Sequence, residues 1–255
     1  MLEPETVEKL RQLLALECNC SPEDFLKEEA VLTLPRLQEG RRIYSHQPDF
    51  FHMTTLGKNA VIMADERLHP WLREFTADKP GHWLFEFPNL RVIERELIYY
   101  GFQLSQTYHM FLPSRAPLSV PPPPAERMSL TIRWLSGEDF SPYYGDARFP
   151  NAVCQPRSAD RPDKLGIIAL EGEEILGMAA CSADAPGWWQ IGVDVCPGHR
   201  TRGLGSYLVG QLKEAILRQG ILPFYGTSLS NLASWRTALC CGFYPAWVEV
   251  NSTAL

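Results

Sequence analysis

The chain has 255 residues, of which 45% are hydrophobic, and a formal net charge of −6 at pH 7. A chain of this length supplies enough apolar side chains for one large packed domain or two modest ones. The negative balance gives no whole-protein field for nucleic acid, and no apolar run approaches the roughly 20 residues that a membrane span needs. We therefore expect a soluble globular protein without a nucleic-acid or membrane partner.

Cysteine usage and the first residues bear on the compartment. The seven cysteines show no C-x-x-C spacing, and the chain begins with acidic residues where a signal peptide would be basic. We expect reduced thiols, no structural zinc site and a cytoplasmic location.

Two features of the sequence divide the chain. Leucines fall on one face of a predicted helix over residues 5–16. Further along, residues 113–124 contain six prolines, which remove backbone donors and favour an extended spacer. We predict a smaller α/β domain over residues 1–112, a linker over 113–128 and a second domain over 129–255.

Periodicity predicts the elements of the second domain. Apolar residues that alternate with polar ones indicate strands, and apolar residues three or four apart indicate helices. The predicted elements are a strand over 129–134, a hairpin over 165–180 that turns at residues 171–174, a strand over 188–195, a helix from Leu204, a strand over 221–225, a helix opened by Asn231 and a strand over 243–250.

The turn at residues 197–206 joins a strand to a helix and has the build of a diphosphate cradle. Gly203 and Gly205 let the backbone approach an anion, so that several N–H groups can point at one phosphate. The helix start adds unpaired N–H groups and a positive dipole end. Arg200 and Arg202 add permanent positive charge.

The familiar nucleotide-binding templates do not fit this turn. A P-loop needs Lys followed by Ser or Thr, and a dinucleotide fingerprint needs three glycines spaced G-x-G-x-x-G. The pattern Arg200-x-x-Gly203-x-Gly205 instead resembles the R/Q-x-x-G-x-G/A signature of the GCN5-related N-acetyltransferases, the GNAT superfamily.

The resemblance extends over residues 129–250. Asn231 opens a predicted helix and is followed by Gly242 and Phe243, in the order that this superfamily shows. It implies an α/β fold of the α+β type, in which helices flank a mixed central β-sheet.

A weak internal repeat links the two halves. Asn89 is followed after an interval by Gly101 and Phe102, much as Asn231 is followed by Gly242. The N-terminal half is then a degenerate domain of the same kind without an anion turn. The alternative is a chance match between two helix-to-strand turns, because glycine commonly ends helices.

The resemblance implies acetyl-CoA as co-substrate and no metal. Strand backbone would pair with the pantetheine, the turn would hold the diphosphate, and the later helix would contribute polar groups. The implied cofactor-binding residues are Val193, Asp194, Val195, Arg200, Thr201, Arg202, Gly203, Leu204, Gly205, Ser206, Asn231 and Ser234.

Direct transfer to an amine needs a proton acceptor. Asp194 is the acidic residue at the end of the implied fourth strand and is a candidate base. It could instead face solvent or pair with Arg200 or Arg202. A main-chain N–H near Val193 or Asp194 would polarise the thioester carbonyl.

The general acid is less clear. Many members of the superfamily place Tyr seven residues after the Asn, where this chain has Ala238. Tyr225 and Ser234 are candidates for that role. Tyr225 could instead be a packed core aromatic, and Asn231 could bind cofactor, cap its helix, or do both.

These features predict an N-acetyltransferase that transfers the acetyl group of acetyl-CoA to an amine, which we expect to be a small molecule. An implied first helix near Tyr143, Tyr144, Arg148 and Phe149 would overhang the acceptor. The alternative function is a non-catalytic acyl-CoA-binding sensor or regulatory module. The sequence identifies neither the acceptor nor the oligomeric state.

Overall fold

The computed structural model describes residues 1–115, 121–124, 130–200 and 203–255. The chain forms two compact units. Unit 1 comprises Met1–Leu2, Phe111–Thr227 and Asn231–Tyr244, and unit 2 comprises Glu3–Met110, Ser228–Ser230 and Pro245–Leu255. Packing thus groups the last residues with the N-terminal ones, whereas the sequence analysis kept them with the C-terminal domain. Of the predicted linker, residues 116–120 and 125–129 lie outside the described residues.

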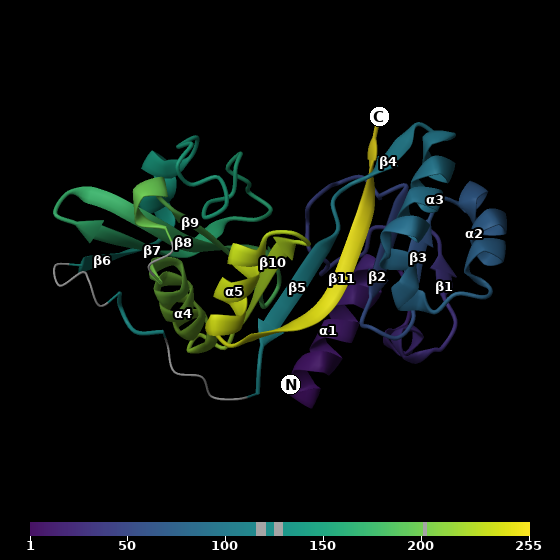
Figure 1. Ribbon diagram of the computed structural model, residues 1–255, viewed down its shortest axis with the longest axis horizontal. Helices are drawn as coiled ribbons and strands as arrows, with labels where there is room; N and C mark the ends of the chain where they lie inside the picture. Colours follow the sequence, from purple (N-terminus) through teal and green to yellow (C-terminus); the bar gives the residue numbers. More distant parts are fainter. Residues whose placement is uncertain (116–120, 125–129, 201–202) are drawn as a thin grey trace. The chain divides into compact units, whose positions relative to one another are not determined.

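Unit 1 is built on a mixed sheet with the strand order β6-β7-β8-β9-β10 (Figure 1). Neighbouring strands are antiparallel up to β9, and β9 and β10 are parallel. The strands are β6 (Leu130–Leu135), β7 (Asp163–Glu171), β8 (Glu174–Ala185), β9 (Trp188–Val195) and β10 (Leu222–Ser228).

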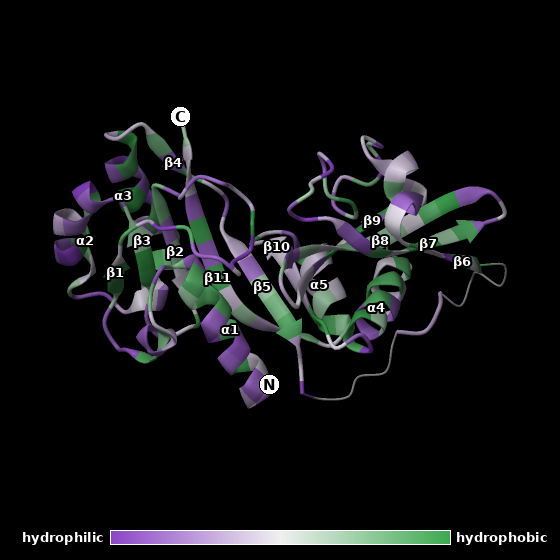
Figure 2. Cartoon of the chain, turned by 180° about the vertical axis from the view of Figure 1, so that it is seen from behind, coloured by the Kyte–Doolittle hydropathy of each residue, from purple (hydrophilic) through white to green (hydrophobic). Residues whose placement is uncertain are grey.

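Two α-helices contribute to the core of unit 1. They are α4 (Leu204–Leu217) and α5 (Leu232–Cys240), and a short 3₁₀ helix, η5 (Pro197–His199), precedes α4. Leu204, Leu208 and Leu212 recur at helical spacing and are buried against β7, β8 and β9. Figure 2 shows the hydrophobic residues along α4 and β7. The predicted fold class, a mixed central sheet flanked by helices, is confirmed.

The predicted first helix near Tyr143 and Arg148 is wrong. Residues 136–162, all of which the structure describes, contain one 3₁₀ helix, η4 (Gly137–Tyr143), and otherwise turns and bends. Pro142, inside η4, lacks the backbone N–H that a longer helix would use, and Gly145 has φ +82°, a left-handed conformation that ends a helix. The segment still packs on the sheet, with Phe140 and Phe149 fully buried.

The strands of unit 2 follow the order β1-β3-β2-β11 within the same 11-stranded sheet, with β4 paired to the end of β11. The β1–β3 pair is parallel, and the β3–β2 and β2–β11 pairs are antiparallel. The strands are β1 (Val31–Thr33), β2 (Phe51–Thr55), β3 (Val61–Ala64), β4 (Phe102–Leu104) and β11 (Phe243–Ala254), and β5 (Tyr108–Pro113), like β11, has residues in both units.

The helices of unit 2 include the predicted N-terminal helix, which spans Pro4–Glu17 as α1. The others are η1 (Pro22–Leu26), η2 (Glu66–Leu68), α2 (His69–Thr76), η3 (Gly81–Phe85) and α3 (Phe87–Ile98).

The internal repeat is partly visible in these elements. Gly101 and Gly242 both have positive φ, +82° and +77°, and both end a helix just before a strand. Asn231 caps α5, but Asn89 lies inside α3, where its side chain donates to Trp83 O. The two segments therefore share the helix-to-strand turn and differ at the helix start.

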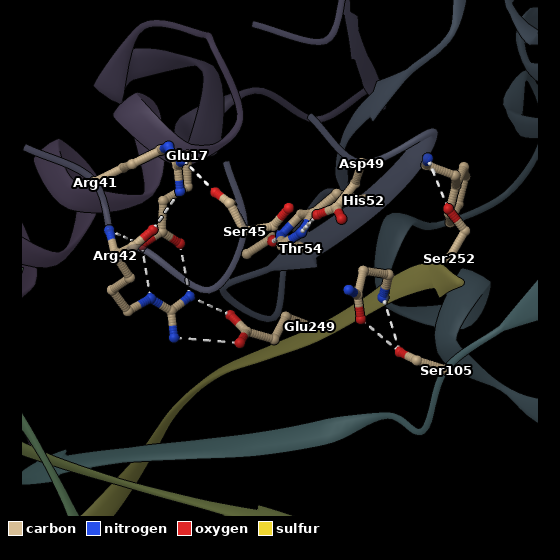
Figure 3. A network of polar contacts seen from close by, with 12 residues as sticks. Glu17, Arg41, Arg42, Ser45, Asp49, His52, Thr54, Ser105, Glu249 and Ser252 are labelled. Carbon is tan, nitrogen blue, oxygen red and sulfur yellow. Dashed lines mark hydrogen bonds and ion pairs between the residues drawn. The ribbon is translucent and has the colours of Figure 1, made fainter. Parts of the chain in front are cut away.

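A buried ion-pair network ties three segments of unit 2 together (Figure 3). The Arg42 guanidinium lies between two carboxylates, with 2.6 Å contacts from Nη2 to both Glu17 Oε2 and Glu249 Oε2. Trp247 Nε1 also donates to Glu249 at 2.6 Å. Burial opposes ionisation of Glu249, but Arg42 outweighs it and holds the pKa of this carboxyl below its usual value.

Replacing Arg42 with Ala leaves two buried carboxylates without their counter-ion. We expect the Arg42→Ala variant to lose about 3–5 kcal/mol of unfolding free energy, as when one partner of a buried pair is removed. Urea unfolding followed by circular dichroism measures the loss. The control is Lys9→Ala, whose partner Glu5 is exposed, and which should change stability by about 0.5 kcal/mol or less. Equal small losses in both variants would contradict this role of Arg42.

Candidate functional site

Strands β9 and β10 separate part of the way along their length. Their parallel pairing runs from Leu222–Trp188 to Tyr225–Ile191, and in the described residues it ends there. Both strands continue, β9 to Val195 and β10 to Ser228. On its other side, β9 stays paired with β8 as far as Val195. One edge of β9 is therefore open beyond Ile191.

The backbone groups at this open edge belong to Val193 and Val195. Cys196 N–H donates to Leu176 O on the β8 side, at 2.9 Å. In an antiparallel ladder, successive residues point their backbone groups to alternate sides. The backbone groups of Val193 and Val195 therefore point toward the β10 side. The Val195 carbonyl accepts from Arg200 Nε at 3.0 Å.

The glycine turn follows directly. Gly203 has φ +80° and is the N-cap of α4, a conformation that side chains with a Cβ rarely adopt. A Cβ on Gly205 would lie 3.4 Å from Val195 Cγ2, so the first turn of α4 packs closely on β9. The first N–H groups of a helix have no partner within it and carry the positive end of its dipole.

The other predicted residues of the turn are placed as follows. Leu204 is 1% exposed, so it can offer a ligand its backbone but not its side chain. Ser206 O accepts from Cys241 Sγ, which holds α4 to the end of α5. His199 Nε2 lies 3.0 Å from Glu174 Oε1. Thr201 and Arg202 lie outside the described residues.

The structure brings Tyr225, Ser234 and Asn231 together. Tyr225 is at the last paired position of β10, and its hydroxyl lies 2.7 Å from Ser234 Oγ on α5. Asn231 Oδ1 accepts from Ser234 N at 3.1 Å, so Asn231 caps α5. Burial raises the pKa of Tyr225 to about 12, although the Ser234 hydrogen bond opposes the shift. Tyr225 is therefore both a core aromatic and a protonated hydroxyl at the point of strand separation.

Asp194 lies on the opposite face of β9 from Val193. Neighbouring side chains of a strand alternate between faces, and Val193 packs with the α4 core. The Asp194 carboxylate accepts from Asn151 N, Asn151 Nδ2 and Ala152 N at 2.7, 2.6 and 2.8 Å. In the described residues, which do not include Arg202, the Asp194 carboxylate thus holds a loop by three hydrogen bonds.

Gly192 and Asn151 are two further residues of the site that were not predicted from the sequence. A Cβ on Gly192 would lie 1.8 Å from Asn151 O, so the loop backbone contacts the strand backbone where β9 leaves β10. A lone glycine inside an alternating strand is a signal for such an approach. Asn151 carries no comparable signal in the sequence.

Ala238, at the position of the superfamily's usual Tyr, is fully buried in the core. Across the described ranges, no group of three or more His, Cys, Asp or Glu is arranged to hold a metal ion. Within the same ranges, every helix is too short or too polar to cross a membrane.

The C-terminal part of the chain matches a protein-family model. The model of the acetyltransferase (GNAT) family matches residues 130–243, which contain β6 to α5 and the glycine turn. Comparison with curated proteins found no match.

Solved structures with similar backbones include proteins described as acetyltransferases. A GCN5-related N-acetyltransferase from Sphaerobacter thermophilus is 14% identical, with a TM-score of 0.49 over 99% of this chain and 93% of that one. One from Kribbella flavida is 18% identical, with a TM-score of 0.47 over 62% of each chain. The match thus spans less than two thirds of the length of the Kribbella flavida protein. A Salmonella typhimurium protein solved with its cofactor acetyl-CoA is 19% identical, with a TM-score of 0.36 over 50% of this chain and 94% of that one.

The sequence resemblance to this superfamily is thus confirmed for the C-terminal part of the chain, and residues 130–243 are a domain of the acetyltransferase (GNAT) family.

Proposed function

We propose that this protein transfers the acetyl group of acetyl-CoA directly to the amine of a small-molecule acceptor, in the cytoplasm. One observation carries the proposal. The β9–β10 pairing stops at Ile191–Tyr225, and the open edge of β9 leads straight into a glycine turn and a helix N-terminus. The opening can take an extended chain, and the turn can take its phosphates.

The residues of the opening suit the parts of acetyl-CoA. The Val193 backbone points to the open side and can pair with the pantetheine amides as another strand would. The N–H groups at the start of α4 and the charge of Arg200 suit the diphosphate. The space beside Gly203 is open to a ligand, since even a Cβ built there would have no atom within 4 Å. Thr201 and Arg202 belong to the same proposed cradle.

Acetyl-CoA, when bound, supplies its acetyl group as a thioester. In the proposed reaction the amine nitrogen forms the new bond to the acetyl carbon, and the carbon–sulfur bond breaks with its electron pair left on sulfur. The amine loses one proton to water, and the thiolate takes up one proton to leave as the free thiol. The Val193 N–H can donate to the thioester oxygen as negative charge develops there. The fold then needs no covalent enzyme intermediate.

In this proposal the Tyr225 hydroxyl stabilises the leaving sulfur. Its raised pKa keeps the phenol protonated at neutral pH. A thiol has a pKa of about 8.5, so the phenol is the weaker acid of the two. Tyr225 therefore acts as a hydrogen-bond donor to the thiolate, and Ser234 orients its hydroxyl.

A second function, an acyl-CoA sensor without turnover, is favoured by two specific observations. The position of the superfamily's usual acid is the buried Ala238, and Asp194 is engaged with the 151–152 backbone. Both functions require acetyl-CoA binding, and they differ in thiol release. A protein that binds acetyl-CoA but releases no thiol with any amine would be the sensor.

Acetyl-CoA binding depends on space beside the first turn of α4. We expect the native protein to bind acetyl-CoA in calorimetry and the Gly205→Trp variant to lose detectable binding, because a Cβ at this position lies 3.4 Å from Val195 Cγ2 and an indole would push the first turn of α4 away from β9. The control, Arg218→Trp, places the same side chain at the exposed C-terminal end of α4 and should leave the affinity unchanged. Equal affinities in all three proteins would contradict the proposed cradle.

Turnover depends on the Tyr225 hydroxyl. We expect Tyr225→Phe to lower kcat by about 10²- to 10³-fold, as for other single donors to a developing charge. The control is Tyr244→Phe, which removes a hydroxyl from an exposed residue and should leave kcat unchanged.

The same pair of variants gives a pH test. Because burial raises the pKa of Tyr225 to about 12, native kcat should show no alkaline loss from this group between pH 7 and 10. Thiol release at fixed saturating acetyl-CoA measures both effects. An alkaline loss near pH 10 that Tyr225→Phe abolishes would show an exposed phenol and sink this account.

A further inference from the structure

We propose that Asp194 is a positioning residue that fixes the segment 149–153 beside the acetyl-transfer site, and that this segment governs how the acceptor amine binds. The inference rests on the proposed function and goes beyond it, because it gives the acidic residue of β9 a role other than proton abstraction.

Within the described ranges, the side-chain hydrogen bonds of Asp194 go to two successive residues of one segment. Its Oδ2 accepts from both backbone N–H groups, those of Asn151 and Ala152, at 2.7 and 2.8 Å. Its Oδ1 accepts from Asn151 Nδ2 at 2.6 Å. Hydrogen bonds to an ionised acceptor are about twice as strong as neutral ones. Asp194 therefore holds the backbone N–H groups of this segment with charge-assisted hydrogen bonds.

A close backbone contact fixes the same place. Asn151 O lies so near Gly192 that any side chain at this position would collide with it. Gly192 is the first residue of β9 after the last pair with β10. The segment is thus held where the two strands part, on the face of β9 opposite the α4 core.

The rest of the segment is anchored independently. Phe149, Ala152 and Val153 are buried in a cluster with β7 and β8 residues, and Asn151 is exposed. Beyond them, Cys154 N donates to Asp163 Oδ1 at 3.1 Å. A fixed segment with one exposed polar residue beside the transfer site is suited to contact the acceptor.

This engagement competes with a role as base. Asp194 Oδ2 already accepts two hydrogen bonds, and Oδ1 accepts one. A base role would therefore depend on the remaining acceptor position of Oδ1, whereas a positioning role depends on the three contacts themselves.

An exchange of side chains tests the proposal. A carboxylate can only accept, so Asn151→Asp alone sets two carboxylates against each other, and Asp194→Ala removes the acceptor. The double exchange, Asp194→Asn with Asn151→Asp, restores a donor and an acceptor, because the amide oxygen introduced at position 194 can take the backbone N–H groups. Glu138→Ala is the control, since Glu138 is exposed and lies on η4.

Amide hydrogen exchange of the full-length proteins reads the positioning directly. We expect the Asn151 and Ala152 amides to exchange faster in Asp194→Ala and Asn151→Asp, and to regain protection in the double exchange and keep it in Glu138→Ala. Unchanged protection in Asp194→Ala would overturn the proposal, whether or not turnover is detected.

Kinetics separate positioning from base catalysis. The probes are acetyl-CoA with spermidine, tyramine, glucosamine or a peptide N-terminal amine. We expect each single variant to lower kcat/KM by about 100-fold, as for a misplaced substrate, mainly by raising the KM of the amine, and the double exchange to recover most of it. A loss of about 10²- to 10⁴-fold in kcat that persists in the double variant would instead identify a base, if KM and the amide hydrogen exchange at Asn151 are unchanged.

Calorimetry with acetyl-CoA on the same samples keeps the two proposals apart. Equal acetyl-CoA affinity in the native and variant proteins is expected, because the Asp194 side chain faces away from the cradle. A native protein that does not bind acetyl-CoA would refute the proposed function, and the exchange pattern would still decide the role of Asp194.

Discussion

The separation of β9 from β10 is the constraint on which the rest of unit 1 depends. Backbone N–H and C=O groups in a fold are almost always paired, so a strand edge left open inside a sheet is costly unless something else pairs with it. Here β9 keeps its β8 partner and loses its β10 partner after Ile191. An extended ligand with amide groups can satisfy that edge.

The surrounding residues support this opening rather than close it. Arg200 binds the Val195 carbonyl and so fixes the start of the turn, and Gly205 lets α4 pack against β9. On the other strand, Tyr225 ends the pairing, and its hydroxyl is oriented by Ser234. The opening therefore has the glycine turn and the start of α4 at one end, the backbone edge of β9 along its side, and the Tyr225 hydroxyl where the strands part.

Several carboxylates in this protein form hydrogen bonds or ion pairs with residues that lie far away in the sequence. Asp194 holds Asn151, and Asp163, whose pKa is raised by burial, accepts from the Tyr144 hydroxyl at 2.9 Å. In unit 2, Glu249 pairs with Arg42 across 207 positions. An acidic residue near a functional site can thus have a positional role, and its sequence position alone does not separate that role from catalysis.

The regular elements could be predicted from the sequence because their signals are local. The alternation of residues 188–195 gave the bounds of β9, and the leucines after Gly203 gave α4. The Asn231 cap was readable from its place before a helix, whereas Asn89 was misleading because its helix begins earlier.

The remaining features depend on contacts between distant residues. The prediction of a first helix was wrong because it followed the helix order of the family and did not take account of Pro142 and Gly145, which interrupt a helix. The Asp194–Asn151 contact spans 43 positions and the Arg42–Glu249 pair 207, and no periodicity reports such pairs. The hydrogen bond between Tyr225 and Ser234 joins two candidates that the sequence could name but not place together.

A crystal structure of the full chain with acetyl-CoA bound is the most direct test of this account. The account predicts pantetheine amides paired with the Val193 backbone, the diphosphate over the N-terminus of α4 and the sulfur within hydrogen-bonding distance of the Tyr225 hydroxyl. Acetyl-CoA bound elsewhere, or bound with the open edge of β9 unpaired, would contradict it.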